Sequence, residues 1–367
     1  MKHSLTLLVL FVALIAQSCS NEKIENGLSE SNPQTKVLSL SEFSYEAKDR
    51  FGNIEKGERK RQYSYKHDYL IVYDKNGNEI EDSSYNSDGS LSSKDTYKYD
   101  ENGNKTEDSS YNSDGSLSSK DTYKYDENGN KTERNLYNSD GSLSAKLTNK
   151  YDEKGNETEW NLYNSDGSLS VKFTYKYDEN GNKTERNEYS SGGSFISKDI
   201  YKYDENGNEI EDSSYSSDGS LSYKLTYKYD ENGNKTEDSR YNSDGSLDYK
   251  YTYKYDEKGN NTEDSRYNSD GSLDYKYTYK YDEKGNKTER NLYNSDGSLR
   301  SKVIIKYDEN GNKTEVSSYN VYDRVGSLRS KDTYKYEFDK QGNWIKKIEF
   351  KDGIPEYILE RQYEYYD

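Results

Sequence analysis

The sequence has few of the residues on which enzyme and metal sites depend. Its 367 residues include one cysteine, Cys19, and two histidines, His3 and His67. One cysteine forms no intrachain disulfide, a structural zinc site takes about four Cys or His ligands, and Ser or Cys nucleophiles need a histidine base. We therefore expect a non-enzymatic protein with no catalytic residues, no metal site and no cofactor.

Hydrophobic residues are also scarce. They make up 29% of the chain with tyrosine included, and 43 of the residues are tyrosine. Without its tyrosines the composition would be that of a disordered chain. The net charge of −17 excludes nucleic acid as a partner, because proteins that bind nucleic acid present concentrated positive charge.

The N-terminus has the pattern of a targeting segment. Lys2 and His3 precede an apolar run over residues 5–16, which is short for a membrane span, and Cys19 follows. This resembles a bacterial lipoprotein signal, which implies lipidation at Cys19 and a lipid anchor at the outer membrane or cell surface. The alternative is a plain secretory peptide. We assign 1–18 to the signal peptide and 19–37 to a polar tether.

The remaining chain is organised by a repeat. The unit Tyr-Asp-x-x-Gly-Asn recurs every 26 residues from Tyr73 to Tyr307. A period of this length indicates stacked units that stabilise one another and end in atypical copies. We assign 38–72 to an N-terminal cap with a degenerate repeat, 73–337 to the tandem repeats and 338–367 to a C-terminal capping hairpin.

Each repeat contains two turn signals, such as Asp100–Asn104 and Asn112–Ser116. Each has a glycine where a type I turn with a bulge needs a left-handed residue. The segments between turns alternate in polarity, so each repeat is predicted to be a pair of strands. Strict alternation places Glu107 on the face of Asp121 and Tyr123, and sets Asp108 across from Lys120.

Charge decides how these strands pair. In a parallel coil, Glu107 and its equivalents would form a ladder of like charges about 4.8 Å apart, whereas hairpins place lysines between them. The predicted fold is all-β: an elongated antiparallel β-meander of tandem 26-residue hairpins. It is either open and twisted or curled into a superhelix or partial shell, with tyrosine inside.

The repeated phrase of residues 97–106, Tyr-Lys-Tyr-Asp-Glu-Asn-Gly-Asn-Lys-Thr, resembles the YD or RHS repeat of bacterial surface and toxin-delivery proteins. The resemblance covers roughly residues 45–343 and identifies the chain with YD-repeat surface lipoproteins. In RHS proteins such hairpins curl into a hollow shell around a toxin. The resemblance therefore implies, as an alternative function, a structure that encloses cargo.

Two groups of side chains are candidate binding surfaces. The first is a tyrosine row that alternates onto one face, which can stack on sugar rings or contact a protein; it can equally be a thin core. The second is an apolar group on the otherwise polar face, which is either a contact site or drift within the repeat. The first group is Tyr249, Tyr251, Tyr253, Tyr275, Tyr277 and Tyr279, and the second is Leu136, Trp160 and Leu162.

The recurring Asp-x-Asn-Gly-Asn does not match the spacing of an EF-hand, so we interpret it as a turn. We expect a surface binding or spacer module whose partner is a polysaccharide or a cell-surface protein, besides the membrane. The rival hypothesis is a glycan-active enzyme that uses paired carboxylates such as Glu107 and Asp121.

Overall fold

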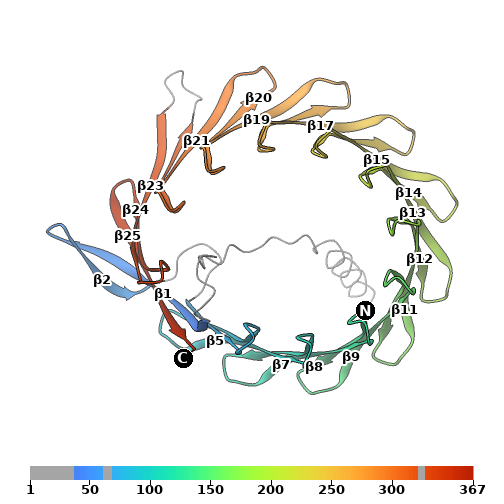
Figure 1. The fold of residues 1–367 in the computed structure, drawn as a ribbon, viewed down its shortest axis with the longest axis horizontal. Coiled ribbons are helices and arrows are strands. Elements are labelled where there is room, and N and C mark those ends of the chain that lie inside the picture. The colour runs from blue at the N-terminus through green and yellow to red at the C-terminus, as the bar shows by residue number, and fades with distance from the viewer. Residues whose placement is uncertain (1–36, 61–67, 321–326, 367) are drawn as a thin grey trace, which may run out of the picture.

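The computed structural model describes residues 37–60, 68–320 and 327–366, which form a single antiparallel sheet of 25 strands without any helix in these ranges (Figure 1). The first strands are β1 (Val37–Arg50), β2 (Asn53–Arg59), β3 (Asp68–Tyr73), β4 (Glu79–Tyr85), β5 (Leu91–Tyr99), β6 (Lys105–Asn112), β7 (Leu117–Tyr125), β8 (Lys131–Asn138), β9 (Leu143–Tyr151), β10 (Glu157–Asn164), β11 (Leu169–Tyr177) and β12 (Lys183–Ser190). They continue as β13 (Phe195–Tyr203), β14 (Glu209–Ser216), β15 (Leu221–Tyr229), β16 (Lys235–Asn242), β17 (Leu247–Tyr255), β18 (Asn261–Asn268), β19 (Leu273–Tyr281), β20 (Lys287–Asn294), β21 (Leu299–Tyr307), β22 (Lys313–Asn320), β23 (Ser327–Phe338), β24 (Trp344–Lys351) and β25 (Ile354–Tyr365).

The predicted hairpin turns are present, and the local sequence explains them. In the turn between β5 and β6, the Gly103 amide donates to the Asp100 carbonyl at 3.1 Å, and the Asp100 amide donates to the Asn104 carbonyl at 2.9 Å. Gly103 has φ of 83°, a conformation that costs a residue with a Cβ about 1 kcal/mol or more. The Asp100 carboxylate accepts from the amides of Asn102 and Asn104, so the recurring Asp and Asn stabilise the turn.

Each turn is followed by a bulge that shifts the strand register by one residue. Between β6 and β7, Ser110 pairs with Ser119 and Tyr111 pairs with Leu117, so Ser118 is left over. Strict alternation is therefore broken at every hairpin.

The bulges overturn the face assignment made from strict alternation. Asp108 lies opposite Asp121 rather than Lys120, and Glu107 lies opposite Thr122. Because residues in direct register share a face, Glu107 is on the opposite face from Asp121 and Tyr123. The carboxylate pair of the enzyme hypothesis, Glu107 with Asp121, is therefore split between the two faces.

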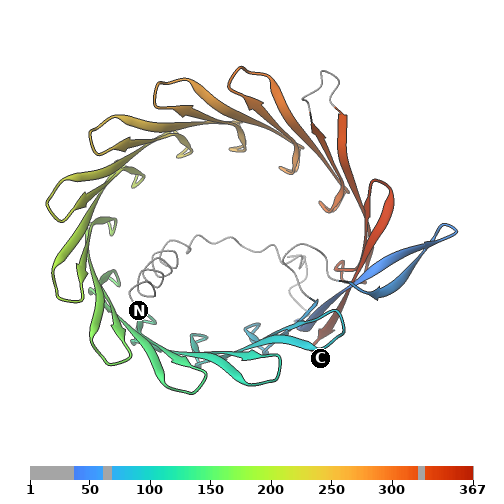
Figure 2. The same cartoon turned by 180° about the vertical axis from the view of Figure 1, so that it is seen from behind.

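The expected overall shape is wrong, because the sheet closes on itself (Figures 1 and 2). Strand β1 pairs with β25, for example Leu40 with Tyr363, and on its other edge with β3, for example Leu40 with Ile71. Among the described strands β2 pairs only with β1, and their hairpin projects from the ring. The other 24 strands form a closed cylinder instead of an open meander, superhelix or partial shell.

Closure is stabilised by the residues that distinguish the two ends from the repeats. The buried hydrophobic residues of the described chain are Leu40 and Ala47 of β1 and Tyr357, Ile358 and Leu359 of β25. These two strands are neighbours in the sheet although more than 300 residues separate them. The apolar ends therefore pack on each other at one seam, where two separate caps would each have left an open edge.

Polar contacts complete the seam. The guanidinium of Arg361 on β25 donates to the Glu42 carboxylate on β1 at 2.7 Å, and the Tyr69 hydroxyl of β3 donates to the same carboxylate. The two side chains of this ion pair are only 10% and 8% exposed, so each charge depends on the other.

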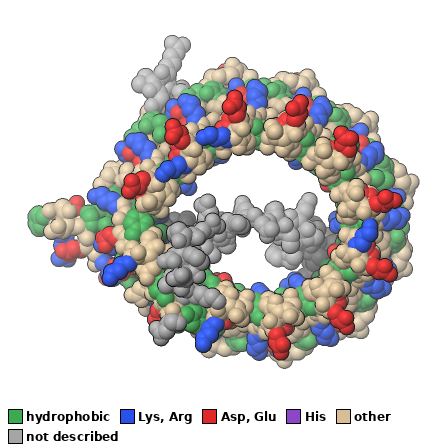
Figure 3. Space-filling view, in the orientation of Figure 1, with side chains coloured by type: hydrophobic (Ala, Val, Ile, Leu, Met, Phe, Trp, Pro, Cys, Tyr) green, Lys and Arg blue, Asp and Glu red, His purple; other side chains and the backbone are tan. Residues whose placement is uncertain are grey.

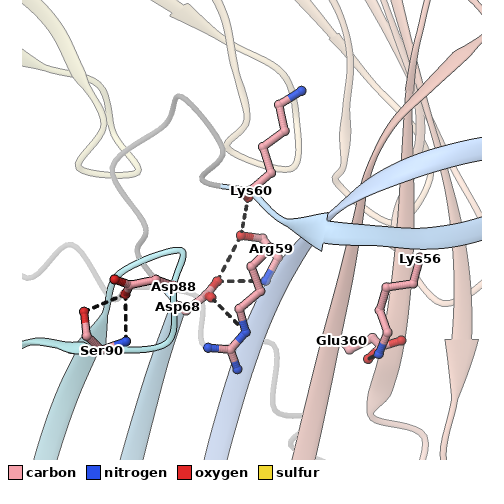
Figure 4. A network of polar contacts seen from close by, with 8 residues as sticks. Lys56, Arg59, Lys60, Asp68, Asp88, Ser90 and Glu360 are labelled. Atoms are coloured by element: carbon pink, nitrogen blue, oxygen red, sulfur yellow. Dashed lines mark hydrogen bonds and ion pairs between the residues drawn. The ribbon is translucent and has the colours of Figure 1, made fainter.

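A second polar network lies where the β1–β2 hairpin leaves the ring (Figure 4). The Asp68 carboxylate accepts from the Ser44 amide and hydroxyl at 2.8 and 2.9 Å, and Arg59 lies 3.8 Å from its other oxygen. Lys56 of β2 pairs with Glu360 of β25 at 2.7 Å. These contacts connect β1, β2, β3 and β25.

The two rims of the cylinder differ. The Asp-x-x-Gly-Asn turns bend inward at one rim, and the Asn-Ser-Asp-Gly-Ser turns splay outward at the other (Figures 1 and 2). Val37 pairs with Tyr365 at the rim of the inward turns. With strands about 4.8 Å apart, 24 strands give a backbone circumference on the order of 100 Å and a diameter of roughly 40 Å.

Candidate functional site

One face of the cylinder carries a ladder of ion pairs. Glu107 of β6 lies 2.8 Å from Lys98 of β5 and 2.6 Å from Lys120 of β7. The arrangement recurs around the ring, for example at Glu133 between Lys124 and Lys146. Hydrogen bonds from these two lysines lower the pKa of Glu133 to about 2. This face is therefore rich in charge, but its glutamates and lysines neutralise one another.

The opposite face carries the tyrosines, and we infer that it is the inner face. Side chains converge on the concave side of a closed sheet, so burial is greater there. Burial is the largest cause of the raised pKa of Tyr97 and Tyr175 on this face. Burial also raises the pKa of Tyr123 to about 12. Figure 3 shows the ring of side chains around a central opening.

The predicted tyrosine row lies on this inner face as an ordered set of rings. Tyr251 and Tyr253 stack with their planes 10° apart and their centroids 6.4 Å apart, and Tyr277 and Tyr279 repeat this at 9° and 6.2 Å. Tyr249 meets Tyr251 edge to face, as Tyr275 meets Tyr277. None of the six is fully buried. The rings are thus partly exposed toward the opening.

Hydroxyl contacts hold these rings in place. The Tyr253 hydroxyl donates to Asp238 at 2.6 Å, and the Tyr279 hydroxyl donates to Asp264 at 2.8 Å. The hydroxyls of Tyr251 and Tyr275 lie 3.2 Å apart, and this hydrogen bond raises the pKa of Tyr275 to about 12. The row is therefore organised before any ligand binds.

Cations lie against several of the rings. The guanidinium of Arg266 is 5.2 Å from the Tyr249 centroid, and the Lys287 ammonium is 3.9 Å from the Tyr279 centroid. Such contacts are attractive because the ring face is negative. These cations were missed by the sequence analysis. The signal for Arg266 is the change from Asp-Ser-Ser-Tyr, as at Asp108–Tyr111, to Asp-Ser-Arg-Tyr, and Lys287 is the lysine that recurs after the Gly-Asn of most repeats.

The apolar group is not on the polar face, as strict alternation predicted, but on the inner face. Trp160 pairs with Phe173, and their rings are 5.5 Å apart. Leu162 lies between Leu147 and Val171, and Leu136 lies opposite Asp121. The bulges explain why the predicted face was wrong. Each bulge shifts the following strand by one residue, which moves its side chains to the other face. The apolar group and the tyrosine row are therefore two sectors of one inner wall.

Cys19, the predicted lipidation site, and His67 lie outside the described residues. Within the described ranges, no group of three or more His, Cys, Asp or Glu residues is arranged to hold a metal ion. The same part of the chain has no helix long and apolar enough to cross a membrane.

No protein-family model and no curated protein matches the chain. Among solved structures it is similar to a Tc holotoxin pore chain from Photorhabdus luminescens, with 12% identity and a TM-score of 0.33 over 80% of this chain and 19% of that one. It is also similar to porin-like proteins from Bacteroides uniformis and Bacteroides vulgatus. Their identities are 11% and 10%, with TM-scores of 0.26 and 0.20, over 59% and 90% of this chain and 96% and 99% of theirs. The chain thus spans about a fifth of the toxin chain.

Proposed function

We propose that the protein is an exported, lipid-anchored surface module that binds glycan chains on the inner, tyrosine-lined wall of its ring without chemically changing them. The observation that carries the proposal is the pair of stacked tyrosines repeated on neighbouring hairpins, at Tyr251 and Tyr277. A flat, partly exposed ring with a fixed hydroxyl offers a sugar both an apolar face and a polar edge. Recurrence along the wall suits a ligand that is itself a repeating polymer.

The experiment is a glycan array probed with the mature protein, followed by dissociation constants for any polymer retained. Tyr251→Ala and Tyr277→Ala should each weaken retention, because each removes one stacking platform. The matched control is Tyr267→Ala. Tyr267 lies between them in sequence but pairs with Lys250, a lysine of the ion-pair face. Equal loss in all three variants, or retention unaffected by any of them, would contradict the proposal.

The lipid anchor rests on Cys19 and has its own test. Cys19→Ser should move the protein from the membrane fraction to the soluble fraction and abolish labelling by a fatty-acid probe, because an acyl chain supplies the apolar burial that anchors a protein. The proposed location at the outer membrane or cell surface depends on this anchor. Unchanged labelling of the variant would exclude lipidation at this residue.

Closure of the sheet favours one alternative, a ring that encloses a polypeptide cargo. Native mass spectrometry of protein purified from its own cell envelope separates the two functions. A bound polypeptide of constant mass would support cargo, whereas a ladder of sugar masses would support glycan binding.

A further inference from the structure

One end of the tyrosine row contains two cations without an acidic partner. Lys287 and Arg290 lie on β20, and neither is within 4.0 Å of a carboxylate among the residues that the structure describes. Lys287 also lies over Tyr279, and the guanidinium of Arg290 is 5.8 Å from the Tyr277 centroid. Burial lowers the pKa of Lys287, as expected for a cation that is desolvated without a compensating charge.

Equivalent arginines elsewhere in the ring are neutralised. Arg134 forms two hydrogen bonds with Asp121 on the preceding strand, and Arg186 lies 2.9 Å from Asp199 on the following strand. At Arg290 both acids are missing. Tyr277 occupies the position of Asp121, and Val303, directly opposite Arg290, occupies the position of Asp199.

The one acid that acts on Lys287 is already engaged. Asp264 accepts hydrogen bonds from the Tyr279 hydroxyl at 2.8 Å and from the Asn261 side-chain amide at 2.6 Å. Arg290 is exposed, whereas Arg134 and Arg186 are only partly so. The repeat therefore presents a free guanidinium and a free ammonium beside two stacked rings.

We propose that Lys287 and Arg290 bind the carboxylate of an acidic sugar whose ring lies against Tyr277 and Tyr279, so that the preferred ligand is a polyuronate. A guanidinium matches the two oxygens of a carboxylate geometrically. Val303, next to Arg290, provides an apolar neighbour. This inference rests on the proposed glycan binding and specifies its substrate class.

The net charge of −17 does not prevent such binding. Charges are screened over about 8 Å at physiological salt, so the groups in contact with the ligand determine its affinity. Two nearby acids are paired with arginines: Asp274 with Arg266, and Asp248 with Arg240 at 3.6 Å.

The test compares polygalacturonate with its carboxyl-reduced form, which keeps the polymer and removes the charge. Wild-type full-length protein should bind the acidic polymer about tenfold more tightly, because a hydrogen-bonded charge pair contributes on the order of 1.5 kcal/mol or more. Lys287→Gln with Arg290→Gln should lose about that factor for the acidic polymer and leave the reduced polymer unaffected. The control Lys280→Gln removes an outer-face lysine of the same hairpin, which pairs with Glu289.

The outcomes separate the two proposals. Equal affinity for both polymers, or a double variant that keeps its preference for the acidic one, would overturn the Lys287–Arg290 site while glycan binding stands. If the wild type bound neither polymer, this inference would be overturned. The proposal of glycan binding would then be decided by the glycan array alone. Circular dichroism of the double variant identical to wild type shows that any loss is not unfolding.

Discussion

Glu133 illustrates how single side chains stabilise a sheet with little hydrophobic core. It lies 2.8 Å from Lys124 and 2.6 Å from Lys146, on the strands to either side, and its pKa is lowered to about 2. A carboxyl with a lowered folded-state pKa contributes stability above its unfolded pKa and loses it as the pH falls through the folded one. The protein should therefore lose stability between about pH 4.5 and pH 2.

Glu133→Gln should lower the free energy of unfolding at pH 7 by about 1 kcal/mol, since its lysine partners are partly screened by solvent. The difference should shrink as the pH falls from 4.5 and be mostly lost near pH 2, where about half of the folded wild-type protein carries a neutral Glu133. Urea titrations at both pH values measure it, with Glu127→Gln in an exposed turn as the control. A constant difference across this range would contradict the ion-pair explanation.

Asp212 has the opposite linkage. Burial, with a smaller contribution from Asp199, raises its pKa to about 6, although Arg186 opposes the shift. A carboxyl with a raised folded-state pKa costs stability as the pH rises from its unfolded value to its folded one.

Asp212→Asn should therefore stabilise the protein by about 1 kcal/mol at pH 7 and have little effect at about pH 3, below the unfolded pKa. Thermal unfolding at these two pH values tests the sign. Destabilisation at pH 7 would show that the charged form of Asp212 makes a favourable contact.

At the scale of the element, substitutions at two adjacent glycines in one turn distinguish the effect of backbone conformation from that of packing. Gly193, between β12 and β13, has φ of 76°, whereas Gly192 is not in the left-handed region. A methyl group added at either position would meet open space, with no atom nearer than 3.9 Å. Gly193→Ala should cost about 1 kcal/mol and Gly192→Ala should be neutral or slightly stabilising. Equal effects would contradict a left-handed turn at this position.

The hairpins could be predicted because each turn is specified by five consecutive residues, as in Asp100–Asn104. The faces could not be assigned by alternation alone, because Ser118 and its equivalents are extra residues in the strand. Counting one bulge per turn would have put Glu107 on the face of Lys120, and Trp160 on that of the tyrosines. Once the bulge residues are counted, the pattern predicts both the face of the ion-pair ladder and the inner position of the apolar group.

At the scale of the whole molecule, closure depends on a sum of small angles between neighbouring strands, which no single repeat specifies. The sequence does contain a signal, since the residues that form the seam, such as Leu40 and Ile358, give both ends an apolar density that the repeats lack. We interpreted these ends as separate caps. Buried edges that match in register can also pair with each other, as Leu40 and Tyr363 do.

The closed ring is the central claim, because the inner wall exists only if β1 and β25 pair. Ser41 of β1 lies opposite Gln362 of β25. In a Cys19→Ser background, Ser41→Cys with Gln362→Cys should form a disulfide on mild oxidation, detected as a faster-migrating band in non-reducing gels and by mass spectrometry of the linked peptides. Ser41→Cys with Ser214→Cys, on a distant strand, is the control. Efficient crosslinking of the first pair alone is the predicted result, whereas no crosslink in folded monomer, or equal crosslinking of both pairs, would contradict the closed ring.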